Sequence, residues 1–167
     1  MIADPLRRGR ALAELFLSVA PRLHDQLGEA GVLAAADDVV RAREEWECFA
    51  LYACVRGLVA AGGFNRETAA AIDALHDRVL EAWKGTSPSP QAFEARRGTM
   101  AERYAEYGTI GQAGGAAGAA TVAGRLGAAA ARHIAPRDPA PAELAELVGA
   151  LHESLAESAA ESVRRAE

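Results

Sequence analysis

The sequence is poor in aromatic residues, in lysine and in cysteine, and it lacks the alternating pattern that is typical of strands. Aromatic side chains make up 5% of the 167 residues, although half of the residues are apolar. Alanine supplies much of the apolar content, and alanine-rich chains with leucine at helical spacing favour helices. The single lysine, Lys84, among many arginines indicates a GC-rich bacterial genome.

The chain also lacks an extended basic face. Its net charge is −5, and acidic and basic residues alternate along the sequence. Nucleic-acid-binding proteins usually carry clustered lysine and arginine, because the phosphate backbone dominates their affinity. The arginine clusters here are short, as at Arg96-Arg97 and Arg164-Arg165. Nucleic acid is therefore not an expected partner.

The only two cysteines, Cys48 and Cys54, lie six residues apart in one predicted helix. This spacing separates them by about 9 Å along the helix axis and places them on different faces. A disulfide needs a much closer pair of Cα atoms. We expect both to be small reduced core residues of a cytoplasmic protein.

No segment has the composition of a membrane-spanning helix. The uncharged run between Tyr107 and Gly124 contains only Ile110 and Val122 as large aliphatic residues, whereas a spanning helix needs about 20 predominantly apolar residues. Near the N-terminus an apolar run resembles a signal sequence, but Glu14 interrupts it. We therefore expect a helix there, and no membrane association.

Helical spacing of leucine and other large apolar residues predicts an all-α fold: one domain, residues 1–167, built as a bundle of about five helices. Asp4-Pro5 and Asn65 are typical helix starts, and Gly62-Gly63 is a typical helix end. Pro21 is expected to kink or split the first helix. The predicted helices cover approximately 6–28, 33–62, 66–84, 90–133 with a possible kink near residue 114, and 139–165.

The stretch 43–62 is predicted to be the buried central helix. Its large apolar residues leave no face free, and a helix that is apolar all round is usually buried. The early part of the same helix, up to Glu45, is rich in charge, so burial is expected only in the later part. The apolar residues are Trp46, Phe49, Leu51, Tyr52, Val55, Leu58 and Val59.

Glycine and alanine dominate the segment from Gly108 to Ala131. A flexible linker is one interpretation. The favoured one is a close-packing helix, about 99–132, whose glycines form a smooth seam against another helix, because glycine in an unpacked helix costs about 1 kcal/mol relative to alanine. The partner helix could lie within the chain or in a second copy. The seam consists of Gly108, Gly111, Gly115 and Gly118.

Several polar and aromatic residues are candidates for a pocket or an interface. Arg103, Tyr104 and Tyr107 form the densest polar–aromatic cluster, and tyrosine and arginine are favoured at binding hot spots. Cys48 and His76 could form a nucleophile and base, although a structural thiol is the preferred interpretation. His76 lacks the partner motif that a bundle metal site would need, so no metal is expected. Trp46 completes the candidate set.

These patterns favour a non-enzymatic helical interaction protein, such as an adaptor, a regulatory or immunity factor, or an assembly subunit. Its partner would be another protein or a second copy of itself, and neither a cofactor nor a catalytic residue is expected. The alternative is a small-molecule-binding protein or enzyme with a pocket between the second, third and fourth helices. Replacing Cys48 or His76 by alanine would abolish function only under this alternative.

Overall fold

A computed structural model describes residues 4–34, 38–113 and 119–165, with the side chains of residues 119 and 120 left aside. These residues form helices and connecting turns, and no strand occurs among them. The all-α class is therefore confirmed, with six helices in the described residues where about five were predicted. The helices are α1 (Pro5–Glu29), α2 (Val39–Gly62), α3 (Arg66–Thr86), α4 (Pro90–Ala113), α5 (Ala119–Ile134) and α6 (Ala142–Arg164).

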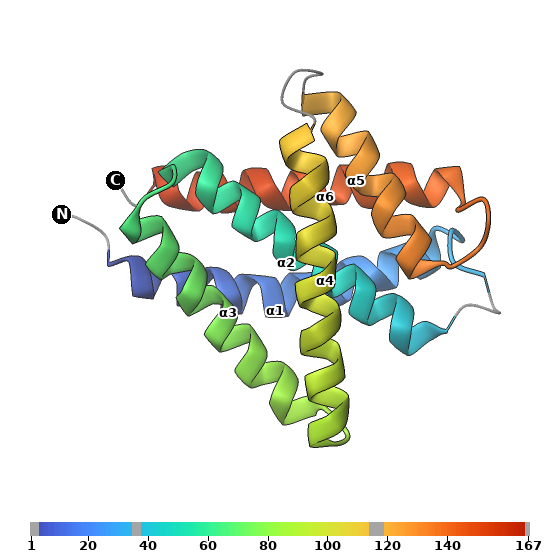
Figure 1. Ribbon diagram of the computed structural model, residues 1–167, viewed down its shortest axis with the longest axis horizontal. Coiled ribbons are helices and arrows are strands. Elements are labelled where there is room, and N and C mark those ends of the chain that lie inside the picture. The colour runs from blue at the N-terminus through green and yellow to red at the C-terminus, as the bar shows by residue number, and fades with distance from the viewer. Residues whose placement is uncertain (1–3, 35–37, 114–118, 166–167) are drawn as a thin grey trace.

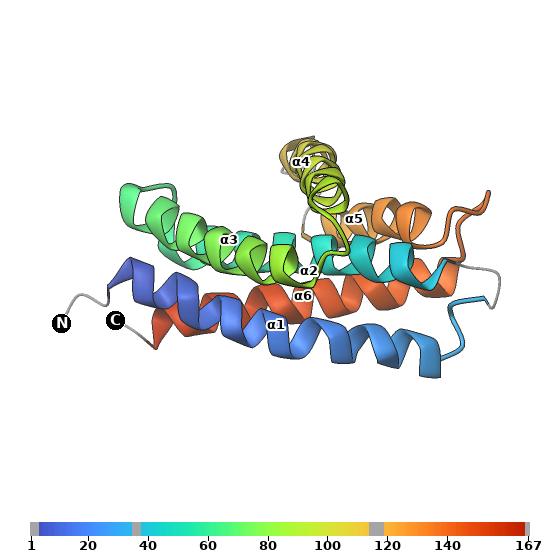
Figure 2. The ribbon, with the colours of Figure 1, turned by 90° about the horizontal axis from the view of Figure 1, so that it is seen from below.

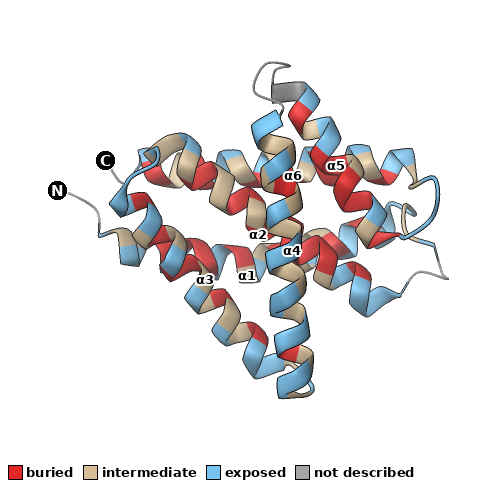
Figure 3. Ribbon diagram, in the orientation of Figure 1, coloured by how far each residue is buried: buried red, intermediate tan, exposed pale blue. Residues whose placement is uncertain are grey.

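The helices are stacked in levels. α1 and α6 run along the long axis on one side of the molecule, and α2, α3 and α5 lie over them (Figures 1 and 2). α4 crosses the outside of this arrangement and is seen almost end-on in Figure 2. The most extensive helix pairings are α2 with α6, α1 with α3, and α5 with α6. α4 is consequently the most exposed of the helices, as the burial colours of Figure 3 show.

α2 occupies the centre, because it is in contact with each of the five other helices. Trp46, Phe49 and Leu51 are fully buried, and Leu58 is nearly so. One face of the helix is less buried than the sequence predicted, because Tyr52, Val55 and Val59 are only half-buried. The later part of α2 therefore has an accessible apolar face.

The N-terminal part of α2 corrects two predictions. The helix begins at Val39, not near residue 33, because the Asp38 side chain accepts a hydrogen bond from the Arg41 backbone N–H (3.1 Å) and caps it there. Burial also begins early, at Ala42, and it includes the carboxylates of Glu45 and Glu47. The charged early part was expected to be solvated.

The predicted long helix at 90–133 is in fact two helices, α4 and α5, which run in different directions (Figure 1). The predicted kink near residue 114 lies outside the described residues. α4 contacts α2, α3 and α5, whereas α5 packs mainly on α6. The predicted single helix with a possible kink is therefore replaced by two helices in the described residues.

Local capping explains the other helix ends well. Asp4 accepts from the Leu6 N–H (3.0 Å) ahead of Pro5, and Asn65 accepts from the Thr68 N–H (2.9 Å). Gly63 ends α2 at φ 72°, a left-handed conformation that glycine adopts without strain. α1 runs through Pro21 as one helix, and there the Arg22 side chain donates to the Ser18 carbonyl (3.0 Å).

Three pairs of helices approach closely at glycine. A Cβ added to Gly9 of α1 would collide with the Ala71 carbonyl oxygen of α3, and one added to Gly57 of α2 would collide with that of Ala156 in α6. Gly127 of α5 meets α6 in the same way. These contacts permit the short distances between the helix backbones that pack most extensively.

Candidate functional site

A buried ion pair joins α4 to α2. Arg103 donates from Nε and Nη2 to the two carboxylate oxygens of Glu45, at 2.9 Å each. Glu45 is only 5% exposed, and a buried carboxylate is costly unless it is paired and hydrogen-bonded. The hydrogen bond with Glu45 raises the pKa of Arg103. This two-pronged geometry fixes the position of α4 over the N-terminal half of α2.

A second buried carboxylate ties three helices together. Glu47 of α2 accepts from Arg43 in its own helix (3.2 Å) and from Arg96 of α4. The Arg96 guanidinium carbon lies 3.6 Å from the centre of the Trp83 ring, at the end of α3. An arginine over a tryptophan face is attracted by the ring's negative π surface. Arg96 thus links the acidic part of α2 to α3.

His76 and Tyr104 meet between α3 and α4. His76 Nε2 and Tyr104 Oη are hydrogen-bonded at 2.9 Å, and the Tyr104 ring packs edge-on against Tyr52 of α2. Burial lowers the pKa of His76 and raises the pKa of Tyr104 well above its usual value. Both side chains are therefore held in their neutral forms at neutral pH.

His152 and Tyr107 are the polar side chains buried most deeply. His152 stacks on Phe49 with ring centroids 4.1 Å apart, and its Nδ1 donates to the Phe49 carbonyl at 3.0 Å. Burial lowers the pKa of His152 to about 3. Tyr107 packs on the same Phe49 ring at 5.1 Å. Neither Tyr107 Oη nor His152 Nε2 has a hydrogen-bond partner among the described residues.

The predicted set of six candidate residues does not converge on one pocket. Arg103, Tyr104 and Tyr107 face α2 from α4, and His76 joins them from α3. Trp46 instead turns to α1, where its Nε1 donates to the Ala20 carbonyl at 2.8 Å. The structure therefore brings four of the six together at the crossing of α4 with the bundle, and Cys48 is a fifth residue close to them.

Cys48 adjoins the same crossing, because its thiol interacts electrostatically with Arg103, Tyr104 and Tyr107. It lines a cavity of about 550 Å³ between α2, the end of α3 and the start of α4, together with Trp83, Arg96 and Met100. Burial, and then the nearby carboxylate of Glu45, raise the pKa of Cys48 to about 12. A nucleophilic thiol needs a lowered pKa. Cys48 is therefore a protonated, free thiol, as Cys54 is.

The described residues contain no group of three or more histidine, cysteine, aspartate or glutamate side chains placed to hold a metal ion. Over the same part of the chain, none of the helices combines the length and the apolar content that a membrane crossing requires.

An apolar groove lies where α2, α6 and the end of α4 meet. It has a volume of about 560 Å³. Tyr52, Val55 and Val59 of α2 form one side, and Ala156 and Ala160 of α6 form another. We call this surface the α2–α6 groove. It is lined in addition by Gly108 and Gly111 of α4, by Phe64 in the turn after α2, and by Arg56, Glu153, Glu157 and Arg164.

The groove contains half of the predicted glycine seam. Gly108 and Gly111 have only the Tyr52 hydroxyl near the position of a Cβ, at 4.0 Å and 3.9 Å. No helix backbone in the described residues covers them there. Gly115 and Gly118 lie outside the described residues. The seam, and whether it packs within or between chains, stays a prediction.

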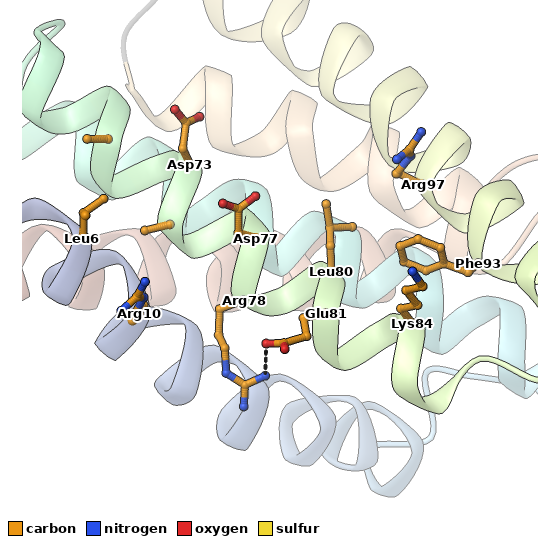
Figure 4. Close-up of a pocket in the computed structure, with 12 residues that line it drawn as sticks. Leu6, Arg10, Asp73, Asp77, Arg78, Leu80, Glu81, Lys84, Phe93 and Arg97 are labelled. Atoms are coloured by element: carbon orange, nitrogen blue, oxygen red, sulfur yellow. Dashed lines mark ion pairs between the residues drawn. The ribbon is translucent and has the colours of Figure 1, made fainter.

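A third cleft, of about 750 Å³, opens between α1, α3 and α4 (Figure 4). Asp73 and Asp77 lie one turn apart on α3, and Lys84 and Arg97 stand at the far end. Arg78 pairs with Glu14 and Glu81 at its edge. The lining of this cleft is mostly charged, whereas ligand sites are lined mainly by apolar and aromatic side chains with few polar groups.

Sequence reasoning missed the buried Glu45 and Glu47, the inward His152 and the groove. His152 had a usable signal, since it continues the inward positions Leu144 and Val148 of α6 at a spacing of four residues. The groove had no such sequence signal, because it is formed by three helices that are distant in the sequence.

Comparison of the chain with protein-family models, with curated proteins and with solved structures finds no match.

Proposed function

We propose that this chain is a non-enzymatic helical interaction protein of the bacterial cytoplasm, and that the α2–α6 groove is its binding surface. The observation that carries the proposal is an apolar groove beside an aromatic residue, Phe64, that is 94% exposed. Soluble proteins rarely expose large contiguous apolar surfaces without a binding role. The role would be that of an adaptor, a regulatory or immunity factor, or a subunit of an assembly.

The shape of the groove supports a protein partner. Its apolar side runs along α2 at positions 52, 55 and 59, so it is a strip along a helix and not a closed chamber. Grooves between helices bind amphipathic helices by this kind of strip. The half-buried glycine edge of α4, at Gly108 and Gly111, offers no side chain to obstruct an approaching backbone.

The alternative function is the binding of a small molecule in the cavity beside Cys48. That cavity places an aromatic ring, Trp83, and a thioether, Met100, near the buried carboxylate of Glu45. Aromatic and apolar side chains beside a fixed polar group are features of small-molecule sites, and in this cavity polar and charged residues make up the other half of the lining.

One experiment separates the two functions. A photo-crosslinking amino acid is placed at Val59 in the groove, at Thr99 in the cavity, or at Gln91, which is exposed and lines neither. Each variant is irradiated in living cells and analysed by gel electrophoresis and by intact mass. We expect protein-sized adducts from position 59 and not from positions 91 or 99.

Other outcomes decide against the proposal. Small-molecule adducts at position 99, with no protein adduct at 59, would favour the alternative function. Equal protein adducts at all three positions would mean that position 59 meets proteins only by random collision, and the groove would then not be a specific binding surface.

A further inference from the structure

We infer that the occupant of the α2–α6 groove is a second copy of this chain, with Phe64 of each copy inserted into the groove of the other. The inference rests on the proposed function, and it names the partner for that surface. Four features of the described residues support it: a fixed aromatic projection, a floor without bulky side chains, a balanced set of charges, and the presence of projection and groove on one face.

Phe64 is a projection held by a rigid turn. Gly63 before it ends α2 in a left-handed conformation, and Asn65 after it caps α3. The Asn65 side chain also donates from Nδ2 to the Gly62 carbonyl, at 2.6 Å. The backbone on both sides of Phe64 is thus fixed, while its ring is 94% exposed. Because the backbone of the turn is already ordered, docking of Phe64 costs mainly the freedom of its own side-chain torsions.

The groove has a floor that can accept an aromatic ring. Gly57 brings the α2 backbone against Ala156 of α6, and Ala160 lies one turn further along α6. The α6 backbone occupies the Cβ position of Gly57, so this contact closes the bottom of the groove, to which Ala156 and Ala160 add only methyl groups. Tyr52 stands at the inner end, so an entering Phe64 ring would meet an aromatic neighbour there, and such pairs attract one another beyond their burial.

The charges around the groove suit a second copy. Two arginines, Arg56 and Arg164, and two glutamates, Glu153 and Glu157, line it, so the charges of this surface sum to zero. The whole chain carries −5, and copies that met through an average surface would repel one another. Within one copy these charges already form two ion pairs, Arg56 with Glu153 and Arg164 with Glu157, so a second copy meets a balanced surface without net repulsion.

Projection and groove share one surface, since Phe64 itself lines the rim. A two-fold dimer requires such self-complementarity, because the same patch of both copies forms the interface. When each Phe64 enters the opposite groove, the two rings lie close to the symmetry axis. Gly108 and Gly111 then meet the second copy, which gives the glycine seam an intermolecular partner.

The first test measures the mass of the purified chain by sedimentation velocity from micromolar to millimolar concentration. We expect a concentration-dependent dimer, and Phe64→Ala should raise its Kd by about tenfold or more, as truncation of a central aromatic anchor does. The Phe64 side chain takes no part in the capping hydrogen bonds, so the variant should fold. Leu15→Ala is the matched control, because Leu15 is exposed on α1 and does not line the groove.

The second test uses mixing. Phe64→Ala removes the projection but keeps the groove, and Val59→Glu blocks the groove but keeps the projection. Each variant alone should dimerise about tenfold or more weakly than the wild type. An equimolar mixture should form heterodimers, because one intact projection can enter one intact groove. If the mixture dimerised as weakly as each variant does alone, the inference would be overturned.

The two proposals fail in distinguishable ways. A chain that remains monomeric at all concentrations, yet crosslinks from position 59 to a different protein, overturns the second-copy inference and leaves the proposed function standing. A dimer whose Kd is the same in wild type, Phe64→Ala and Leu15→Ala also overturns it. A monomer without any specific adduct from position 59 removes both proposals.

Discussion

At the scale of one residue, His152 shows how burial keeps a histidine side chain neutral. In α6 it sits where a leucine would be expected, fully buried and stacked on Phe49. The ring donates to the Phe49 carbonyl through Nδ1, so its Nε2 carries the lone pair. A second proton on Nε2 would create a buried charge without a counter-ion, and burial therefore lowers the pKa of His152 to about 3.

Stability should consequently fall in mildly acidic solution. Between pH 6.5, the ordinary histidine pKa, and about 3, the unfolded chain binds a proton at this residue and the folded chain does not. The free energy of unfolding then decreases by up to about 1.4 kcal/mol per pH unit for each such histidine. Burial also lowers the pKa of His24 and of His76, so they add to the slope.

Urea unfolding of wild type and His152→Phe across this pH range checks the contribution of His152. The phenyl ring keeps the stacking on Phe49, so we expect a folded variant with a shallower decline below pH 6. Identical slopes for the two proteins would show that His152 is protonated in the fold, contrary to the expected effect of its burial.

Glu45 and Glu47 show why some residues resisted prediction. Along the sequence they belong to a charged stretch, which ordinarily indicates a solvated helix face. Both are buried, because Arg103 and Arg96 reach them from α4, 58 and 49 residues away. Local composition contains no information about such long-range pairing. The thiols of Cys48 and Cys54, whose burial depends on α2 alone being central, were easier to anticipate.

At the scale of the helix, local signals were reliable and the choice of packing partner was not. Asn65 marks the start of α3 in both the prediction and the structure, because a cap depends on neighbouring residues. The glycines were harder. Their number drew attention to the segment 108–131, which contains Gly127, whereas the other two close backbone contacts described involve Gly9 and Gly57, single glycines in ordinary helical sequence.

Replacing glycine by alanine should therefore lower the free energy of unfolding in α2 and raise it in α4, two helices of equal length. A Cβ at Gly57 collides with the α6 backbone, and we expect Gly57→Ala to destabilise the fold by about 1–3 kcal/mol, as overpacking does. Gly98 in α4 has no atom within 4 Å of its Cβ position. There, Gly98→Ala should stabilise by up to about 1 kcal/mol, the difference in helix propensity.

Urea unfolding of both variants measures the two changes in the free energy of unfolding directly. A Gly57→Ala protein as stable as wild type would mean that α2 and α6 can separate at no cost, and that the close approach is unimportant. A destabilising Gly98→Ala would indicate that a further surface covers α4 at this position.

At the scale of the whole molecule, α2 lies at the centre, as its apolar sequence predicted. The sequence did not predict the position of α4. α4 crosses the outside of the bundle, and only Phe93 and Tyr107 of its residues are buried. It is held by ion pairs and by the hydrogen bond of Tyr104 with His76, together with the few apolar side chains that reach the core. A helix with few apolar positions gives little sequence signal for the surface on which it docks.

Hydrogen exchange should separate these two helices, which have 24 residues each. The amides from Phe49 to Leu58 of α2 can open only when the contacts with all five other helices are lost, so their exchange should require global unfolding. Those of the first half of α4, from Glu94 to Ala101, need only the local release of a mostly exposed helix. We expect them to exchange by orders of magnitude faster, with urea having little effect on their opening. If the α4 amides were as slow as those of α2, α4 would be part of the cooperative core, and its buried ion pairs would contribute as much to stability as the apolar contacts of α2.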